Sequence, residues 1–282
     1  MDSSPDPAQF PPWGRLRPGA VARALTAATR AVPSWPLVKQ LAFPLRRLAR
    51  RFMPGPVDDG LWGHRLRFHP HGNISERRLL FMPDKWDRRE REILARHARP
   101  GTVFLDVGCN FGGYTWWLLH LLGRECTVVA LEPDPELHAR LGFNLATNGW
   151  DNVTVLPYAA GERDGTAVLH IHRENRGENT LLPEGESAES DAVEVPLRTL
   201  ATVVAEAGLP RVDILKVDIE GLEPPVIRAF FAQAAPEMLP RVILCERKDT
   251  PEHDALERFI LERGYRLEAR TRLNMILVRE RE

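Results

Sequence analysis

From residue 101 onward, apolar runs of strand length alternate with longer segments that have helical spacing. TVFLDV at 102–107 precedes a helical segment at 112–122, and CTVVALE at 126–132 precedes another at 135–149. Parallel strands need a long crossover between them, and the crossover is usually a helix. This order therefore predicts a mostly parallel sheet that is covered by helices on both faces.

Further strand-like runs extend this sheet. They are VTVLPYAA at 153–160, VDILKVD at 212–218 and RVILCE at 241–246. The segment 265–280 holds two more strand-like pieces with no helix between them, which predicts an antiparallel hairpin at a sheet edge. We therefore predict an α/β fold with a Rossmann-like, seven-stranded, mostly parallel sheet and an antiparallel C-terminal hairpin.

The N-terminal part of the chain differs in charge from the rest. Residues 1–55 carry nine Lys or Arg against two Asp, although the whole chain has 38 Lys plus Arg and 39 Asp plus Glu. The balanced total argues against bulk electrostatic capture of nucleic acid. The contrast predicts a basic, partly disordered and partly helical segment at 1–58 and a folded domain at 59–282. Within that domain we expect a lead-in at 59–100 and the Rossmann-like core at 101–282.

Residues 21–52 combine helical spacing of apolar residues with arginines off that line, and prolines interrupt the pattern. A basic amphipathic helix is typical of peripheral contact with an anionic membrane or an acidic partner. It is more often a helix packed on its own domain. No apolar run reaches the roughly 18 residues of a membrane span, and the N-terminus lacks a signal-peptide pattern. The three cysteines are widely spaced, so we expect reduced thiols in a cytoplasmic protein and leave the oligomeric state open.

Ligands in open α/β sheets bind beyond the carboxyl ends of the strands, so the first strand–turn–helix unit is the place to look for a site. There, VFLDVGCNFGGYT places Gly108 and Gly112 around the turn, with Asn110 between them. Such glycines let backbone amides approach a ligand, and a helix N-terminus favours an anion. Glu132 ends the next strand, where a carboxylate can accept the hydroxyls of a ribose. The NAD fingerprint GxGxxG has its second glycine where this chain has Asn110, so a carboxylate-bearing nucleoside fits better than a pyrophosphate.

The pattern DVGxNxG, followed by a strand that ends in LEP, resembles the binding loop of class I S-adenosylmethionine-dependent methyltransferases. Further segments follow in the order LEPDPELHARLGFNLATN, YAAGERDG, ENTLL, VPLRTL, DILKVDIEGLEPPVI, ILCE, ERGYRL and NMILV. Through these segments the chain resembles, over about residues 65–280, the FkbM-type family of these enzymes. This resemblance implies S-adenosyl-L-methionine as the cofactor. The binding residues that it implies are Asp106, Gly108, Asn110, Gly112, Glu132 and Pro133.

The resemblance implies O-methylation of a hydroxyl on a small molecule, sugar or glycan. An alcohol is a poor nucleophile at neutral pH, so it needs a base or a metal ion within reach. Asp218 and Glu220 lie at the end of VDILKVDIE and would point the same way in an extended strand, and Glu246 ends the next strand, RVILCE. We predict these three residues as catalytic. A divalent cation between Asp218 and Glu246 is the alternative to a direct base, but with no third oxygen ligand evident we predict no metal site.

Two features of the family pattern concern the loops. The resemblance makes Asn179 and Thr180, in a polar loop, candidate active-site residues. The family usually has Asp after the ThrLeu of VPLRTL, where this chain has Ala201. That carboxylate would cap a helix or touch the substrate, and its function is therefore in doubt here.

Two other functions stay open on these residues. One is a nicotinamide-dependent oxidoreductase on a Rossmann-like sheet, although Asn110 counts against it. The other is a non-catalytic adaptor that keeps the fold and works through its basic N-terminal segment, and Ala201 leaves this function open. The string EPPV at 223–226 lacks the aromatic residue of the amino-group methylation motif, so bases in DNA are not expected as acceptors.

Overall fold

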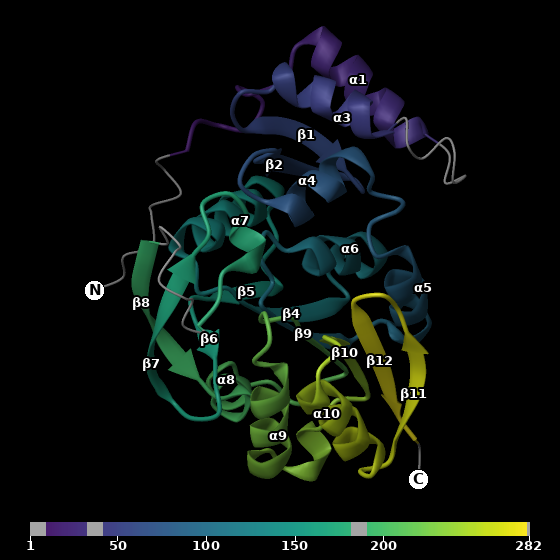
Figure 1. The fold of residues 1–282 in the computed structure, drawn as a ribbon, viewed down its shortest axis with the longest axis vertical. Coiled ribbons are helices and arrows are strands. Elements are labelled where there is room, and N and C mark those ends of the chain that lie inside the picture. Colours follow the sequence, from purple (N-terminus) through teal and green to yellow (C-terminus); the bar gives the residue numbers. More distant parts are fainter. Residues whose placement is uncertain (1–9, 33–41, 182–190, 281–282) are drawn as a thin grey trace.

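A computed structural model describes residues 10–32, 42–181 and 191–280 (Figure 1). The strands of its main sheet are β3 (Thr102–Val107), β4 (Cys126–Leu131), β5 (Val153–Leu156), β9 (Ile214–Val217), β10 (Val242–Glu246), β11 (Tyr265–Arg270) and β12 (Asn274–Arg279). Their order in space is β11-β12-β10-β9-β3-β4-β5. Neighbours from β10 to β5 are parallel, and β12 lies antiparallel to both β10 and β11. The predicted seven-stranded sheet with an antiparallel C-terminal hairpin is confirmed.

Helices cover both faces of this sheet, as predicted (Figure 1). The helices are α1 (Ala20–Ala31), α3 (Ala42–Arg51), α4 (Ile74–Phe81), α5 (Arg88–His97), α6 (Gly113–Leu122), α7 (Pro135–Asn148), α8 (Leu200–Glu206), α9 (Glu223–Gln233) and α10 (Pro251–Leu261). Because side chains alternate along a strand, Phe104 and Val128 pack in one apolar cluster with α6, whereas Leu105 and Val129 pack in another with α9. The central strands are therefore buried on both sides, which explains their nearly continuous apolar runs.

The N-terminal helices belong to the same packed body. α1 and α3 lie side by side above a hairpin of β1 (Val57–Leu61) and β2 (His64–Phe68) (Figure 1). Ala22, Ala49 and Met53 share the apolar cluster of Phe104. The division of the chain at residue 58 stays a prediction. Within the described residues, no helix is both long and apolar enough to cross a membrane.

Residues 10–19, which belong to the N-terminal segment predicted to be partly disordered, lie against this hairpin. The buried Asp58 carboxylate accepts hydrogen bonds from the backbone N–H groups of Gly14 at 2.7 Å and Leu16 at 3.0 Å. It also pairs with the Arg67 guanidinium at 2.7 Å. The content of proline, glycine and serine at the start of the chain favours disorder, but one buried acid orders residues 10–19 through hydrogen bonds to their backbone.

The predicted strand VTVLPYAA is divided in two. β5 ends at Leu156, and the next two-residue strand, β6 (Ala159–Ala160), joins a separate three-stranded sheet with β7 (Gly165–Ile171) and β8 (Asp191–Arg198). Pro157 lies at the break. Proline has no N–H group to donate to the hydrogen-bond ladder of a sheet, so the strand ends there. This second sheet lies beside the β5 side of the main sheet (Figure 1), and its Ala159, Ala160 and Leu169 line the pocket described next.

Candidate active site

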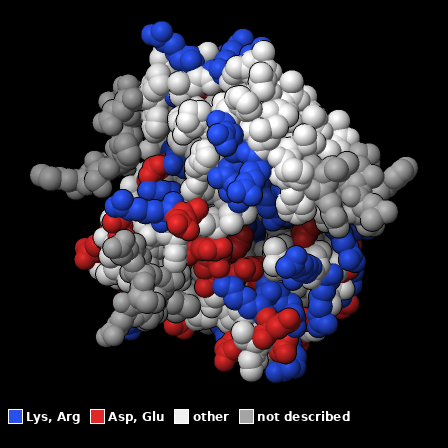
Figure 2. Space-filling view, turned by 45° about the horizontal axis from the view of Figure 1, so that its top comes forward, with Lys and Arg blue, Asp and Glu red and all other residues white. Residues whose placement is uncertain are grey.

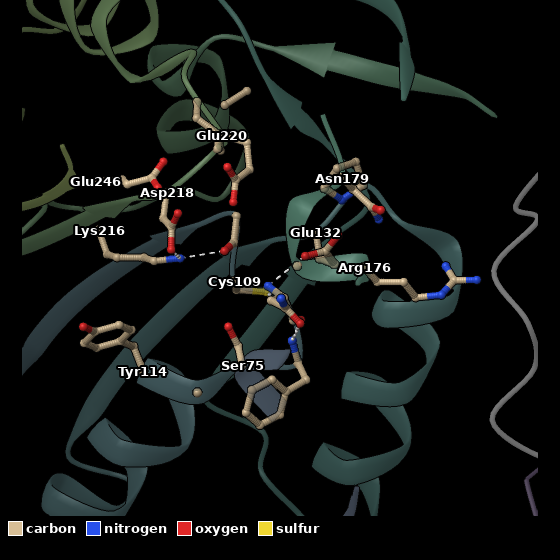
Figure 3. A pocket seen from close by; sticks show the side chains of 18 of the residues that line it. Ser75, Cys109, Tyr114, Glu132, Arg176, Asn179, Lys216, Asp218, Glu220 and Glu246 are labelled. Atoms are coloured by element: carbon tan, nitrogen blue, oxygen red, sulfur yellow. Dashed lines mark hydrogen bonds and ion pairs between the residues drawn. The ribbon is translucent and has the colours of Figure 1, made fainter. Parts of the chain in front are cut away.

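A pocket opens at the carboxyl ends of β3, β4, β9 and β10 (Figure 3). This is where an open α/β sheet is expected to bind its ligand. Most of the predicted site residues line it. They are Gly108, Asn110, Glu132, Pro133, Asp218, Glu220 and Glu246. Asp106 and Gly112 are not among its lining residues.

Asp106 lies beneath the pocket and is fully buried. One of its oxygens accepts a hydrogen bond from Thr115 Oγ1 at 2.8 Å, and the other lies 3.5 Å from Lys216 Nζ. Burial raises the pKa of Asp106, and Lys216 opposes that rise. Lys216 Nζ also donates to the carbonyl of Gly108 at 2.6 Å and lies 3.6 Å from Asp218. Asp106 thus positions Lys216, which in turn reaches the pocket.

Burial by itself would lower the pKa of Lys216. The carboxylates of Asp218 and Asp106 outweigh that effect and raise the pKa above its usual value. Lys216 is therefore a fixed cation shared between the floor of the pocket and its acidic wall.

The two predicted glycines have different surroundings. Gly108 has φ 68°, and a Cβ there would lie 2.0 Å from the backbone oxygen of Asp218. The turn after β3 therefore packs directly against the end of β9, which only glycine allows. Gly112 has φ 85°, and a Cβ there would lie 2.8 Å from the Leu141 side chain. Gly112 thus allows α6 to approach α7 and does not face the pocket.

Glu132 is held by backbone groups on both sides. Its two oxygens accept hydrogen bonds from the N–H of Asn110 at 2.7 Å and of Asp134 at 2.9 Å. Burial raises the pKa of this carboxyl group to about 8. Asn110 has φ 56°, and its Oδ1 accepts from Phe111 N at 2.7 Å and Asn73 Nδ2 at 2.5 Å. This left-handed conformation, which Asn tolerates better than most residues, aims the Asn110 N–H at Glu132.

A segment far from the turn closes this side of the pocket. Arg176 and Asn179 both bind Asp134 Oδ2, at 2.5 and 2.8 Å, and both line the pocket. Asp134 is also the N-cap of α7, since its Oδ1 accepts from Glu136 N at 2.8 Å. Asn179 had been implied by family resemblance, whereas no local signal pointed to Arg176. Thr180 exchanges backbone hydrogen bonds with His170 and is not a lining residue.

Three carboxylates converge at the other side, as Figure 3 shows. Asp218 has 43% of its side chain exposed, and Glu220 has the left-handed φ of 57°. Lys248 Nζ lies 3.0 Å from Glu220 and 3.6 Å from Glu246. Burial, together with the charges of Asp218, Glu220 and Glu223, raises the pKa of Glu246 to about 8, and Lys248 partly offsets this. A carboxyl group whose pKa lies near neutrality is suited to accept a proton.

Glu223 fixes the turn that carries Glu220. Its carboxylate accepts from Ile219 N at 2.7 Å and Gly221 N at 3.0 Å, and shares a hydrogen bond with His253 Nε2 at 3.2 Å. These hydrogen bonds outweigh the effect of burial and lower the pKa of Glu223. The side chain therefore serves the turn first.

Glu223 also bears on the metal question. One oxygen atom each of Asp218, Glu223 and Glu246 lies within 4.8 Å of the others. No third oxygen ligand was evident from the sequence, and in the structure Glu223 is a candidate for it. The signal was available, because Glu223 follows Asp218 by five positions across a turn.

The remaining wall comes from α4, the turn before α5 and the first turn of α6. Trp86 and Tyr114 pack with ring centroids 4.8 Å apart, and Tyr114 Oη donates to Asp87 at 3.2 Å. Arg78 Nη2 lies 3.6 Å from the same aspartate. All four side chains line the pocket. No sequence motif predicted these four residues, because side chains from separate elements that meet in one wall have no fixed spacing along the chain.

Ala201 lies away from the pocket, in the first turn of α8. The helix start is already served by Asp164, which accepts from Thr199 N and from Thr202 Oγ1, both at 2.8 Å. The departure from the family pattern therefore does not alter the lining of the pocket.

Comparison with known proteins finds methyltransferases. A sequence model described as the methyltransferase FkbM domain matches residues 106–267, more than half of the chain. The 2-O-methyltransferase NoeI of Sinorhizobium fredii is 27% identical over 150 residues, which cover 49% of this chain and 60% of that protein. The 31-O-demethyl-FK506 methyltransferase FkbM of Streptomyces tacrolimicus is 28% identical over 182 residues, which cover 54% of this chain and 68% of that protein. The chain thus spans less than two thirds of the length of the first of these relatives.

The solved structures that this chain is similar to include that of an S-adenosylmethionine-dependent O-methyltransferase from Thermotoga maritima. It is 14% identical with a TM-score of 0.40, and the match covers 69% of this chain and 66% of that chain. Of the three functions that the residues left open, the family match supports the methyltransferase and not the oxidoreductase or the adaptor. The chain belongs to the FkbM family of S-adenosylmethionine-dependent methyltransferases.

Proposed function

We propose that this enzyme transfers a methyl group to a hydroxyl of a small molecule, sugar or glycan. The observation that supports this acceptor chemistry is the convergence of Asp218, Glu220 and Glu246 at the pocket, on the edge of the sheet that also carries the glycine turn. An alcohol must lose its proton during the reaction, and these carboxylates are groups that can accept it.

The donor half of the pocket fits a nucleoside. Glu132 is 5% exposed, lines the pocket, and has a spare acceptor position on each oxygen beyond its two backbone hydrogen bonds. We assign it to the ribose hydroxyls of S-adenosylmethionine. Gly108, Asn110 and Pro133 line the same half, and Tyr158 offers an aromatic side for the base. Asp106 and Gly112 would support this half from outside the lining.

The bound donor supplies a methyl group on a sulfonium, so the leaving group needs no further activation. The protein has to hold the acceptor hydroxyl in line and take its proton. We assign the proton to Glu246, whose pKa is raised to about 8. Asp218, fixed by Lys216 at 3.6 Å, would orient the hydroxyl, and Glu220 would hold Lys248 in place.

We favour a direct base over a divalent cation. Asp218 and Glu246 already have lysine partners, and the oxygens of Glu223 are used by backbone amides and His253. A cation would have to compete with two ammonium groups for this cluster. Activity that survives a chelator and is not raised by added Mg²⁺ or Mn²⁺ would support the direct base.

The test is methyl transfer from labelled S-adenosylmethionine to a panel of sugars, glycans and small alcohols, with mass spectrometry to detect the product. Glu246→Gln is expected to lower kcat by about 10²–10⁴-fold, the range for loss of a general base. Donor affinity, measured by calorimetry, should stay within about twofold, because Glu246 lies outside the assigned donor half. Glu237→Gln, an exposed carboxylate outside the pocket lining, is the matched control. Equal activity in the two variants would refute the assignment.

A further inference from the structure

The outer face of α3 combines exposed apolar and basic side chains. Phe43, Leu48 and Phe52 are 60%, 45% and 48% exposed. Arg47 and Arg51 are exposed between them, at spacings that place all five side chains on one side of the helix and its end. We call these five residues the α3 face. The opposite side of the helix packs inward through Ala49.

The α3 face continues into a row of arginines that leads to the pocket. Arg50 on α3 lies 3.1 Å from His71, and the backbone carbonyl of the next residue, Gly72, accepts a hydrogen bond from the N–H of Arg176, whose side chain lines the pocket. Arg77 and Arg78 lie on α4, whose Leu80 shares an apolar cluster with Ala49 of α3. Burial, and after it the charges of Arg50 and Arg46, lower the pKa of Arg77. Arg78 itself lines the pocket. The basic surface and the mouth of the pocket are therefore adjacent.

Acidic partners for this row are few. Within the described residues, no carboxylate forms an ion pair with Arg47, Arg51 or Arg77, and Arg50 pairs with His71 at 3.1 Å. Figure 2 shows a group of basic side chains above a hollow and a group of acidic side chains below it and to its left, with further basic side chains below and to the right. Because no described carboxylate pairs with Arg47, Arg51 or Arg77, their positive charge is complementary to an anionic surface.

We infer that the α3 face docks on an anionic lipid surface and brings the mouth of the pocket to the interface. The apolar side chains would enter the boundary between headgroups and acyl chains, while Arg47 and Arg51 contact lipid phosphates. Nucleic acid would satisfy the arginines but leave Phe43, Leu48 and Phe52 in water. A second copy of the chain would bring Arg47 and Arg51 of both copies together across a twofold axis, which is unfavourable.

Docking itself does not depend on the proposed function. Only its consequence does: an acceptor presented at a lipid surface would meet the pocket without leaving that surface. Vesicle binding needs no donor, so a failure of methyl transfer and a failure of docking can be told apart.

The test is sedimentation of the full chain with phosphatidylcholine vesicles that do or do not contain one third phosphatidylglycerol. We expect binding to the anionic vesicles alone, and weaker binding as salt is added. Phe43→Ser/Phe52→Ser and Arg47→Gln/Arg51→Gln should each lower the partition coefficient by about tenfold or more. Unchanged melting temperatures would show that the variants fold, as expected for exposed positions.

Two double variants are matched controls. Leu121→Ser/Val168→Ser removes apolar side chains that are 42% and 48% exposed elsewhere, and Arg89→Gln/Arg99→Gln removes two exposed charges outside α3. Both should bind anionic vesicles as the unaltered chain does. The inference is overturned if the unaltered chain does not sediment with anionic vesicles, or if the α3 variants bind as well as the controls. It is also overturned if the α3 variants instead abolish a dimer detected by light scattering or the binding of duplex DNA.

Discussion

The turn after β3 and the turn after β9 meet at the pocket, and they hold their polar groups by different means. The first uses backbone amides: Glu132 accepts hydrogen bonds from two N–H groups, and Gly108 lets the main chain come close. In the second, backbone amides donate to Glu223 and fix the turn, but the acids that line the pocket are held by ion pairs between side chains, with Lys216 beside Asp218 and Lys248 beside Glu220. Backbone contacts are rigid and suit a constant donor. A more exposed side-chain pair such as Lys248–Glu220 can be exchanged at little cost in stability, and it suits a variable acceptor.

The largest expected effect is on the lysine that joins the two sides. Lys216→Met removes the ammonium 3.5 Å from the buried Asp106 and 3.6 Å from Asp218. An uncompensated buried charge should lower the free energy of unfolding by about 3–5 kcal/mol, measured by urea denaturation near neutral pH. Lys248→Met, whose side chain is 37% exposed in its ion pair, should cost no more than about 1 kcal/mol. Equal losses would show that burial does not separate the two lysines.

A smaller loss of stability is expected at the backbone side. Gly108→Ala introduces a Cβ 2.0 Å from the Asp218 backbone oxygen at a φ of 68°, so we expect a loss of about 2–4 kcal/mol and weaker donor binding. Gly142→Ala, in the middle of α7 with nothing within 4 Å of the added atom, should instead stabilise by about 0.5–1 kcal/mol. Denaturation and donor titration check both variants. If Gly108→Ala changed neither stability nor donor binding, the close backbone packing of the turn after β3 would not distinguish it from the turn after β9.

The pH dependence of the reaction sharpens the assignment of the base. Glu246 must be ionised to accept a proton, and its pKa is raised to about 8 by burial and by Asp218, Glu220 and Glu223, against the opposing charge of Lys248. As the pH is raised toward about 8, kcat/KM should therefore increase about tenfold per pH unit, and above that pH it should level off. In Glu246→Gln this rise should be absent. A profile that is already flat from mildly acidic pH upward would assign the proton to a carboxylate of ordinary pKa.

The smallest effect is expected where the chain departs from its family. Ala201→Asp adds a carboxylate to the first turn of α8, which the helix dipole favours but the nearby Asp164 opposes. Stability should change by no more than about 0.5 kcal/mol, and kcat should not change. Thermal unfolding and the methyl-transfer assay measure these. A change in kcat of tenfold or more would connect this position to the acceptor.

Much of the site could be predicted because its residues stand at strand ends. Glu132, Asp218 and Glu246 each close an apolar run, and the carboxyl ends of parallel strands meet at one edge of a sheet. Asp106 was expected to bind the donor, but it does not line the pocket, because it lies one residue before the end of β3. There it stands opposite Lys216 on the neighbouring strand β9 and is fully buried. The register of the strands decides whether a residue near a strand end lines the pocket or lies buried beneath it, and a local sequence motif does not reveal that register.

The amino-acid sequence by itself determined the parallel sheet, its C-terminal hairpin, the edge that holds the site and the acids that stand there, because each depends on periodicity or on position along one strand. Only the tertiary structure decided which groups neutralise those acids and what closes the pocket. Arg176 reaches Asp134, Lys248 reaches Glu220, and the α3 helix shares the core of the sheet. These contacts join residues that are far apart along the chain, and nothing local encodes which distant side chain will fill a given space.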